Sequence, residues 1–174
     1  TRPTADRTRE TLFSMLASRL GSFEDLTVAD LFAGSGALGL EALSRGAASA
    51  IFVEQDAGAI RTIRANIAAL RCAQQCDVRA SSVLSLGPVK QPLDLVMPDP
   101  PYGTGAGAVA IDRLTRLGWI GEATWICLET AAKEVPDVRV CEVDAERKVG
   151  KALIDMLDAA PVRPAMCIVG EPTG

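Results

Sequence analysis

Short apolar runs alternate with helix-type patterns along most of the sequence, and this alternation restricts the chain to few folds. Apolar residues recur at helical spacing in four stretches, which predicts helices over 4–20, 37–44, 57–70 and 109–117. The apolar runs between them predict strands over 28–32, 49–53, 78–80, 93–97 and 124–128. Strands that alternate with helices form right-handed βαβ units, so we expect an α/β fold with a parallel sheet covered on both faces. The length, 174 residues, is that of one domain.

The pattern changes after Glu129. Residues 138–143 read as a strand, whereas 151–157 fit a helix by their apolar period and a hairpin strand by their position. The last stretch, 160–174, carries no pattern from which we predict an element.

The overall charge argues against indiscriminate binding to nucleic acid. The chain has 18 basic and 22 acidic residues, a formal net charge of −4. Two basic clusters remain, over 1–20 and 61–79, and each taken alone is typical of a solvated helix face. No run approaches the roughly 18 apolar residues of a membrane span, and no signal peptide is visible, so we expect a cytoplasmic protein. The first residue is Thr1 rather than methionine, which indicates a processed, tagged or truncated chain.

The cysteines favour reduced thiols over a metal site. There are five cysteines and no histidine, so a Cys/His zinc set cannot be completed. Cys72 and Cys76 are four residues apart and could share a helix face. Two thiolates alone do not make a tetrahedral site, and we therefore expect no metal.

A glycine motif stands between the first predicted strand and the helix that follows. Residues 34–39 read Gly-Ser-Gly-Ala-Leu-Gly, which matches G-x-G-x-x-G in its usual strand-to-helix context. Small residues let the backbone approach a ligand, and the helix start offers free N–H groups. Glu54 ends the next strand, where a carboxylate can accept hydrogen bonds from both hydroxyls of a ribose. The motif predicts a nucleoside-containing ligand; the alternative is a tight strand–helix turn with a solvated glutamate beyond it.

Asp30 helps to distinguish two such ligands. It lies inside the first predicted strand, four residues before Gly34. A carboxylate there would repel a pyrophosphate and attract the ammonium group of a methionine moiety, which favours S-adenosylmethionine over a dinucleotide. The alternative is an aspartate held by N–H groups of the loop.

A proline-rich segment, Pro-Asp-Pro-Pro-Tyr over 98–102, ends the fourth predicted strand. Its prolines remove three backbone donors and favour extended geometry. The carboxylate of Asp99 and a carbonyl near Pro100 could hold both N–H groups of an exocyclic amino group, while the Tyr102 ring offers a stacking face. This pattern predicts a site that aims a base nitrogen at an activated methyl group.

These motifs resemble those of a known family. Residues 99–102, together with Asp-Leu-Phe-Ala-Gly-Ser-Gly over 30–36, resemble the amino-directed S-adenosylmethionine methyltransferases. Arg-Pro-Thr-Ala-Asp-Arg-Thr-Arg-Glu over 2–10 and the stretch 31–46 are similar to the bacterial methyltransferases that modify guanine N2 in 16S ribosomal RNA. The likeness spans about residues 2–157.

The resemblance implies a Rossmann-like class I methyltransferase fold: one domain over 1–174, a mostly parallel twisted sheet with helices on both faces, and a C-terminal antiparallel hairpin. Residues 151–157 are then a strand. It implies S-adenosylmethionine as cofactor, and 16S rRNA or a small-subunit assembly intermediate as partner; we expect a monomer. Family members usually begin with a basic β-hairpin ahead of the Arg-Pro-Thr element, and this sequence lacks it.

The site residues that follow fall into two groups. The predicted catalytic residues are Asp99, Pro100, Pro101 and Tyr102. The predicted cofactor-binding residues are Asp30, Ala33, Gly34, Ser35, Gly36, Glu54, Ser82 and Asp99. Ser82 stands at the adenine-contact position, where the family often has Asp or Asn. Phosphate contacts from Arg2, Arg7 and Arg9 are expected to hold the RNA while one base is extruded into the pocket.

Three other functions share part of this pattern. Adenine-N6 methylation of DNA uses the same Asp-Pro-Pro-Tyr chemistry and is opposed by the likeness of the N-terminal half. A nicotinamide oxidoreductase would use the same glycines and Glu54, but the chain has no histidine and its one tyrosine lies in the proline segment. A non-catalytic nucleotide-binding or ribosome-assembly module is the third alternative.

Overall fold

A computed structural model describes residues 3–100, 105–131, 145–149, 152–157 and 165–171. The helices are α1 (Pro3–Leu20), α2 (Ala37–Ser44), α3 (Ala57–Leu70) and α4 (Ala106–Arg116), with short 3-10 turns η1 (Ala73–Gln75) and η2 (Val83–Ser85). The strands are β1 (Thr27–Leu31), β2 (Ser49–Glu54), β3 (Cys76–Ala80), β4 (Leu95–Pro98), β5 (Trp125–Ala131), β6 (Ala145–Val149), β7 (Ala152–Leu157) and β8 (Ala165–Glu171).

Five parallel strands form the part of the sheet that positions the site. Their order is β3-β2-β1-β4-β5, and each neighbouring pair is parallel. The strand order reverses direction between β1 and β4, so a crevice forms outside the carboxyl ends of these two strands. Beyond β5 the sheet continues as β8-β7-β6, with β8 parallel to β5 and with antiparallel pairing of β7 to both β8 and β6.

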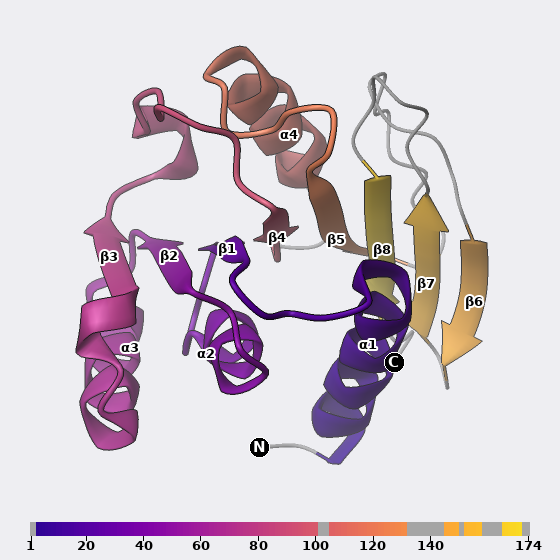
Figure 1. Cartoon of the computed structure of the whole chain (residues 1–174), viewed down its shortest axis with the longest axis horizontal. Helices are drawn as coiled ribbons and strands as arrows, with labels where there is room; N and C mark the ends of the chain where they lie inside the picture. The colour runs from indigo at the N-terminus through magenta and orange to yellow at the C-terminus, as the bar shows by residue number, and fades with distance from the viewer. Residues whose placement is uncertain (1–2, 101–104, 132–144, 150–151, 158–164, 172–174) are drawn as a thin grey trace.

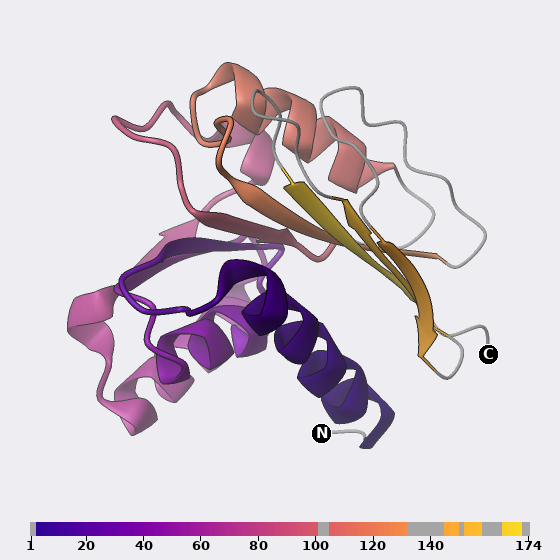
Figure 2. The same ribbon diagram turned by 45° about the vertical axis from the view of Figure 1, so that its right-hand side comes forward.

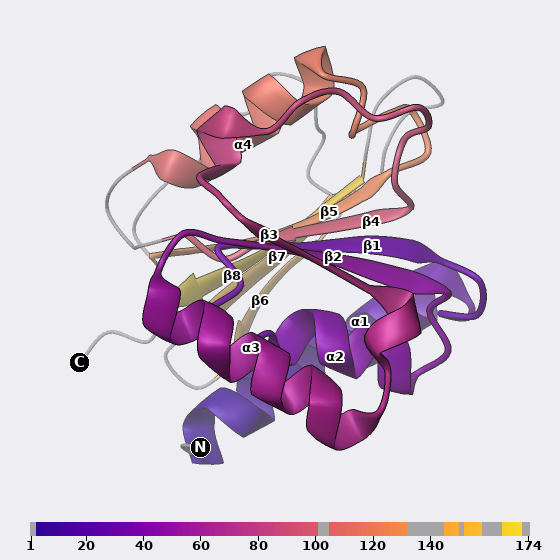
Figure 3. The ribbon, with the colours of Figure 1, turned by 90° about the vertical axis from the view of Figure 1, so that its left-hand side faces the viewer.

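Helices cover both faces of this parallel sheet (Figure 1). Figures 2 and 3 show α1, α2 and α3 together on one face and α4 on the other. The first layer buries Phe13, Leu16, Phe52 and Ile63, and the second buries Ile111, Leu114 and Trp119. The α/β architecture predicted from the alternation of patterns is therefore confirmed. No helix in the described part of the chain is both long and apolar enough to cross a membrane.

Most predicted elements are present, with shifts at their ends. Helices α2 and α3 have the predicted bounds, and the Asp56 side chain caps α3 by accepting the Ala59 N–H at 2.8 Å. Helix α4 begins three residues earlier than predicted, after Gly105 in a left-handed conformation (φ 68°). The prediction missed its first turn because that turn lacks large apolar residues. Strand β8 was not predicted. The strand predicted over 138–143 falls on residues outside the described part.

The spacing of Cys72 and Cys76 suggested that they could share a helix face, but they do not. Helix α3 ends before them, since Arg71 adopts a left-handed conformation (φ 55°) at the C-cap. The two cysteines flank the turn η1 instead, and Cys76 is the first residue of β3.

Candidate active site

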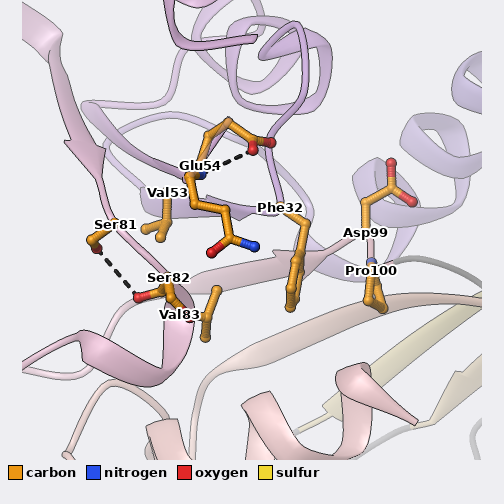
Figure 4. Close-up of a pocket in the computed structure, with 9 residues that line it drawn as sticks. Phe32, Val53, Glu54, Ser81, Ser82, Val83, Asp99 and Pro100 are labelled. Atoms are coloured by element: carbon orange, nitrogen blue, oxygen red, sulfur yellow. Dashed lines mark hydrogen bonds between the residues drawn. The ribbon is translucent and has the colours of Figure 1, made fainter. Parts of the chain in front are cut away.

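A pocket of about 330 Å³ opens where four parallel strands end (Figure 4). Its volume is within the usual range for small-molecule sites, and its position is the crevice where strand order reverses. The residues that line it lie at the ends of β1, β2, β3 and β4 or just after them: Phe32, Val53, Glu54, Gln55, Ser81, Ser82, Val83, Asp99 and Pro100. In Figure 4, Ser82 and Val83 lie on one side of Phe32, and Asp99 and Pro100 lie on the other.

The Glu54 carboxylate is fixed by three backbone N–H groups. Its Oε1 accepts from Gly34 at 2.8 Å, and its Oε2 accepts from Gln55 at 2.9 Å and from Asp56 at 2.8 Å. An ionised carboxylate has about four acceptor positions. Glu54 therefore joins the glycine loop to the end of β2 and keeps acceptor capacity for a hydroxyl of a ligand in the pocket.

The glycine loop has the backbone that its sequence requires. Gly34 (φ 58°) and Gly36 (φ 81°) are left-handed, a conformation that other residues adopt at a cost. Gly39, in α2, packs so closely on β2 that a Cβ atom would overlap the Phe52 ring. The Asn66 side chain of α3 donates to the Ser35 carbonyl at 3.0 Å, a support for the loop that the sequence analysis missed.

Asp30 lies beneath this loop and is not among the residues that line the pocket. It is 1% exposed, and its Oδ2 accepts the Gly39 N–H at 2.9 Å. Its Oδ1 is buried and has no hydrogen-bond partner within the described residues. One oxygen thus has the backbone partner that the alternative interpretation expected.

Burial also changes the charge of Asp30. Desolvation raises the pKa of Asp30 to about 8; the Gly39 hydrogen bond acts against this rise, and the Glu54 charge adds to it. At neutral pH the group is therefore mainly the uncharged acid. The electrostatic argument that separated a pyrophosphate from an ammonium group loses force for the same reason, because a neutral acid does not repel an anion.

The start of the proline segment is held against β1. The Asp99 N–H donates to the Leu31 carbonyl at 3.0 Å, so Asp99 and Pro100 are placed beside the end of that strand. Both residues line the pocket. The other two predicted catalytic residues, Pro101 and Tyr102, lie outside the described part.

Residues 81–83, which follow β3, form one wall of the pocket and are supported by hydrogen bonds to them and to the residues that come next. Ser82 caps η2 by accepting the Leu84 N–H at 3.2 Å, and Val83 is buried. Two side chains from α4 and its C-terminal turn then bind the following residues. Arg113 donates to the Leu86 carbonyl at 3.3 Å, and the Trp119 indole N–H donates to the Gly87 carbonyl at 2.7 Å.

The pocket thus brings together four of the predicted site residues, namely Glu54, Ser82, Asp99 and Pro100. Gly34 reaches them through its bond to Glu54, while Ala33 donates its N–H to the Val53 carbonyl at 3.0 Å and Ser35 is exposed. Sequence reasoning missed the lining residues Phe32, Val53, Gln55, Ser81 and Val83. Phe32 had a signal, because it is an aromatic residue inside the motif; it also has a positive φ of 55°.

Arg9, one of the three arginines predicted to bind RNA, is not among the described residues that line this pocket, and the side chain of Arg7 lies outside the described part. Arg9 forms an ion pair with Glu41 of α2, with Nε and Oε1 3.7 Å apart. Arg2 lies outside the described residues.

Residues 1–158 match the model of a protein family described as conserved hypothetical protein 95. The chain is similar to ribosomal RNA small subunit methyltransferase D of Escherichia coli K12, with 39% identity over 129 residues that are 74% of this chain and 64% of that protein. The Haemophilus influenzae protein of the same name is 38% identical over 133 residues, 74% of this chain and 67% of its own. The chain thus spans less than two thirds of the Escherichia coli relative.

Solved structures with the same arrangement support this likeness. The Escherichia coli protein yhhF, provisionally designated a methyltransferase, superposes with a TM-score of 0.79 at 34% identity and covers 92% of this chain and 88% of its own. A ribosomal protein L11 methylase from Lactobacillus delbrueckii superposes with a TM-score of 0.68 at 19% identity, over 86% of this chain and 77% of its own, and shows a shared fold.

Proposed function

Because the chain belongs to the family described as conserved hypothetical protein 95, we propose that it transfers a methyl group from S-adenosylmethionine to the exocyclic N2 of a guanine in 16S rRNA. The observation that carries the proposal is the meeting of Glu54 with Asp99 and Pro100 in one pocket at the reversal of strand order. The names of the relatives support RNA of the small ribosomal subunit as the substrate.

The residues of the pocket fit S-adenosylmethionine. Glu54 keeps acceptor capacity for a ribose hydroxyl, and the left-handed glycines bring the loop backbone close to the ligand. Val83 and Ser82 form the wall against which the adenine would pack, opposite Asp99. When bound, S-adenosylmethionine supplies an electrophilic methyl group.

The chain's own contribution is to position and polarise the amine. We assign to Asp99 and the Pro100 carbonyl the two N–H groups of guanine N2, with Pro101 keeping the segment rigid and Tyr102 stacking on the base. Guanine N2 is a poor nucleophile because its lone pair is delocalised into the ring. Two acceptors on its N–H groups localise that lone pair and aim it in line with the methyl group, so positioning and electrostatics supply the catalysis.

The rest of the molecule follows from the same proposal. The whole chain acts as one methyltransferase domain, and its partner is 16S rRNA or an assembly intermediate of the small subunit, in the cytoplasm. We also infer that β6 and β7 are the C-terminal hairpin of the class I methyltransferase fold, which their antiparallel pairing supports.

Calorimetric titration tests which cofactor the chain binds, and an Asp99 variant tests the proposed chemistry. We expect the chain to bind S-adenosylhomocysteine and neither NAD nor NADP; binding of a nicotinamide cofactor alone would overturn the proposal. Asp99→Ala is then expected to retain S-adenosylhomocysteine binding and lose at least about a hundredfold in methyl transfer to under-modified small subunits. The matched control is Asp94→Ala: Asp94 precedes β4 whereas Asp99 follows it, and the Asp94 carboxylate accepts the Thr27 N–H at the end of the strand away from the pocket. Unchanged transfer by Asp99→Ala would remove the role given to that residue.

A further inference from the structure

Two thiols lie side by side at the edge of the sheet, away from the pocket. The Cys76 thiol donates a hydrogen bond to Cys72 Sγ across 3.7 Å, and the Cys72 thiol lies 3.8 Å from the Ile67 carbonyl that accepts from it. Both side chains are half-buried, and both are free thiols. Neither belongs to the machinery described above.

The backbone holds the two sulfurs together. The left-handed Arg71 turns the chain out of α3, and the Cys72 N–H remains bound to the Ile67 carbonyl at 3.3 Å. The Gln75 N–H then closes η1 on the Cys72 carbonyl at 3.0 Å. On the other side, Cys76 is fixed in β3 by its pairing with Ala50. The pair is thus set between the end of a helix and the start of a strand.

We propose that Cys72 and Cys76 are an oxidation site that reacts with peroxide and closes into a disulfide within the chain. A disulfide bond is about 2.0 Å long, so the sulfurs, which are 3.7 Å apart, must approach by about 1.7 Å when the bond closes. Their partial exposure lets a small oxidant reach them. Disulfides in reducing compartments are usually transient and sense redox conditions, and a pair of this kind suits that use.

The order of the two steps follows from the hydrogen bond. The thiolate is the reactive form, and the hydrogen bond that the Cys76 thiol donates would stabilise a thiolate on Cys72, so the first attack is assigned to Cys72. Burial and the neighbouring Cys72 raise the pKa of Cys76, which agrees with this order. The Cys72 sulfur attacks one peroxide oxygen, the O–O bond breaks, and Cys72 becomes a sulfenic acid with release of one water. The Cys76 sulfur then attacks the Cys72 sulfur, the S–O bond breaks, and hydroxide leaves with the Cys76 proton as a second water. Two thiols and one hydrogen peroxide thus give one disulfide and two waters.

The sequence offers a direct way to read this reaction. Trypsin cleaves after Arg71 and after Arg79, so both cysteines fall in one peptide, 72–79, which contains no other cysteine. After treatment of the full chain with hydrogen peroxide, we expect this peptide to be lighter by the mass of two hydrogen atoms. It should resist alkylation until it is reduced. The buried Cys127 is the internal control, and its peptide should be alkylated without prior reduction once the chain is unfolded.

Two serine variants test the order of the steps. In Cys76→Ser the reaction should stop at a sulfenic acid on Cys72 that dimedone captures, whereas Cys72→Ser should leave Cys76 open to alkylation. The proposal is overturned if the wild-type peptide 72–79 remains fully alkylated under peroxide, gains oxygen atoms without a bond between its sulfurs, or is joined to a second chain. Cys76 begins β3, about 13 Å along the strand from the end that leads to the pocket, so these results do not depend on the proposed methyl transfer.

Discussion

At the scale of single residues, Asp30 shows how burial alters a group whose type is evident from the sequence. Position and chemistry suggested a charged carboxylate beside a ligand, but the side chain lies under the glycine loop with one oxygen bound to Gly39. Burial favours the neutral acid there, and this property depends on the packing of α2 over β1, which local sequence patterns do not contain.

The raised pKa of Asp30 predicts a pH dependence of stability. The pKa rises from 3.8 to about 8 on folding, so the stability from proton binding is fully present below pH 4 and is lost as the pH rises towards 8. Asp30→Asn replaces the titratable carboxyl group by an amide, and the free energy of unfolding of this variant should change less between pH 5 and pH 8 than that of the wild type. Urea unfolding at a series of pH values measures this difference.

A control variant tests whether removal of another carboxylate changes the pH dependence of stability in the same way. Asp112→Asn removes an exposed carboxylate that pairs with Arg116 at 2.8 Å, and it should leave the pH slope of the wild type intact. An unaltered slope in Asp30→Asn would show that Asp30 is not the titrating group.

At the scale of elements, close packing of α2 on β2 sets the position of the glycine loop. Gly39→Ala should lower the free energy of unfolding by about 1–3 kcal/mol, because the new methyl group overlaps the Phe52 ring. The double variant Gly39→Ala with Phe52→Leu should lose less than the sum of its single changes, as urea unfolding of the four proteins would show.

The control for Gly39 is a glycine in the neighbouring helix. At Gly58, in α3, an added Cβ lies 3.2 Å from the Asp56 oxygen that caps the helix, a contact that a shift of a few tenths of an ångström relieves while the bond to the Ala59 N–H is kept. Gly58→Ala should therefore be neutral or stabilising by up to about 1 kcal/mol. Equal losses at both glycines would mean that α2 is not held by this contact.

The second element with a predicted role is the turn after α4, which supports one pocket wall. Trp119→Phe keeps an aromatic side chain but replaces the buried indole by a smaller phenyl ring and removes the N–H that binds the Gly87 carbonyl. Loss of that bond should weaken S-adenosylhomocysteine binding by about 1 kcal/mol, or about fivefold in Kd. Calorimetry measures the affinity, and thermal unfolding reports any general loss of stability.

Trp125→Phe makes the same chemical change in β5, away from the pocket. It should leave the affinity for S-adenosylhomocysteine unchanged. If both tryptophan variants weakened binding equally, the effect would come from general destabilisation and not from the wall.

At the scale of the whole molecule, a net charge of −4 means that contact with RNA must be local. Charge reversal of Arg2 and Arg7 should lower methyl transfer to small subunits by roughly tenfold at low salt, and the loss should shrink as salt is added. The control reverses Arg61 and Arg64, two exposed residues of α3, and changes the net charge by the same amount. A similar loss in both variants would mean that net charge matters and that the N-terminal surface has no special role.

The sequence was enough to predict the α/β architecture and to locate the two motifs of the site. The remaining helix boundaries and lining residues depend on packing between distant parts of the chain. Periodicity located α2 and α3 because apolar residues at helical spacing indicate the helix face that packs on the core. It could not locate the start of α4, whose first turn is made of small residues, nor the wall formed by Ser81 and Val83. Those residues enter the pocket only because β3 pairs with β2, a contact between distant parts of the chain.

Among the residues that the structure describes, those that line the pocket come from one stretch of the chain, 32–100. Sequence change after β5 can therefore vary the rest of the molecule while this lining, including the proposed base-holding residues Asp99 and Pro100, stays the same.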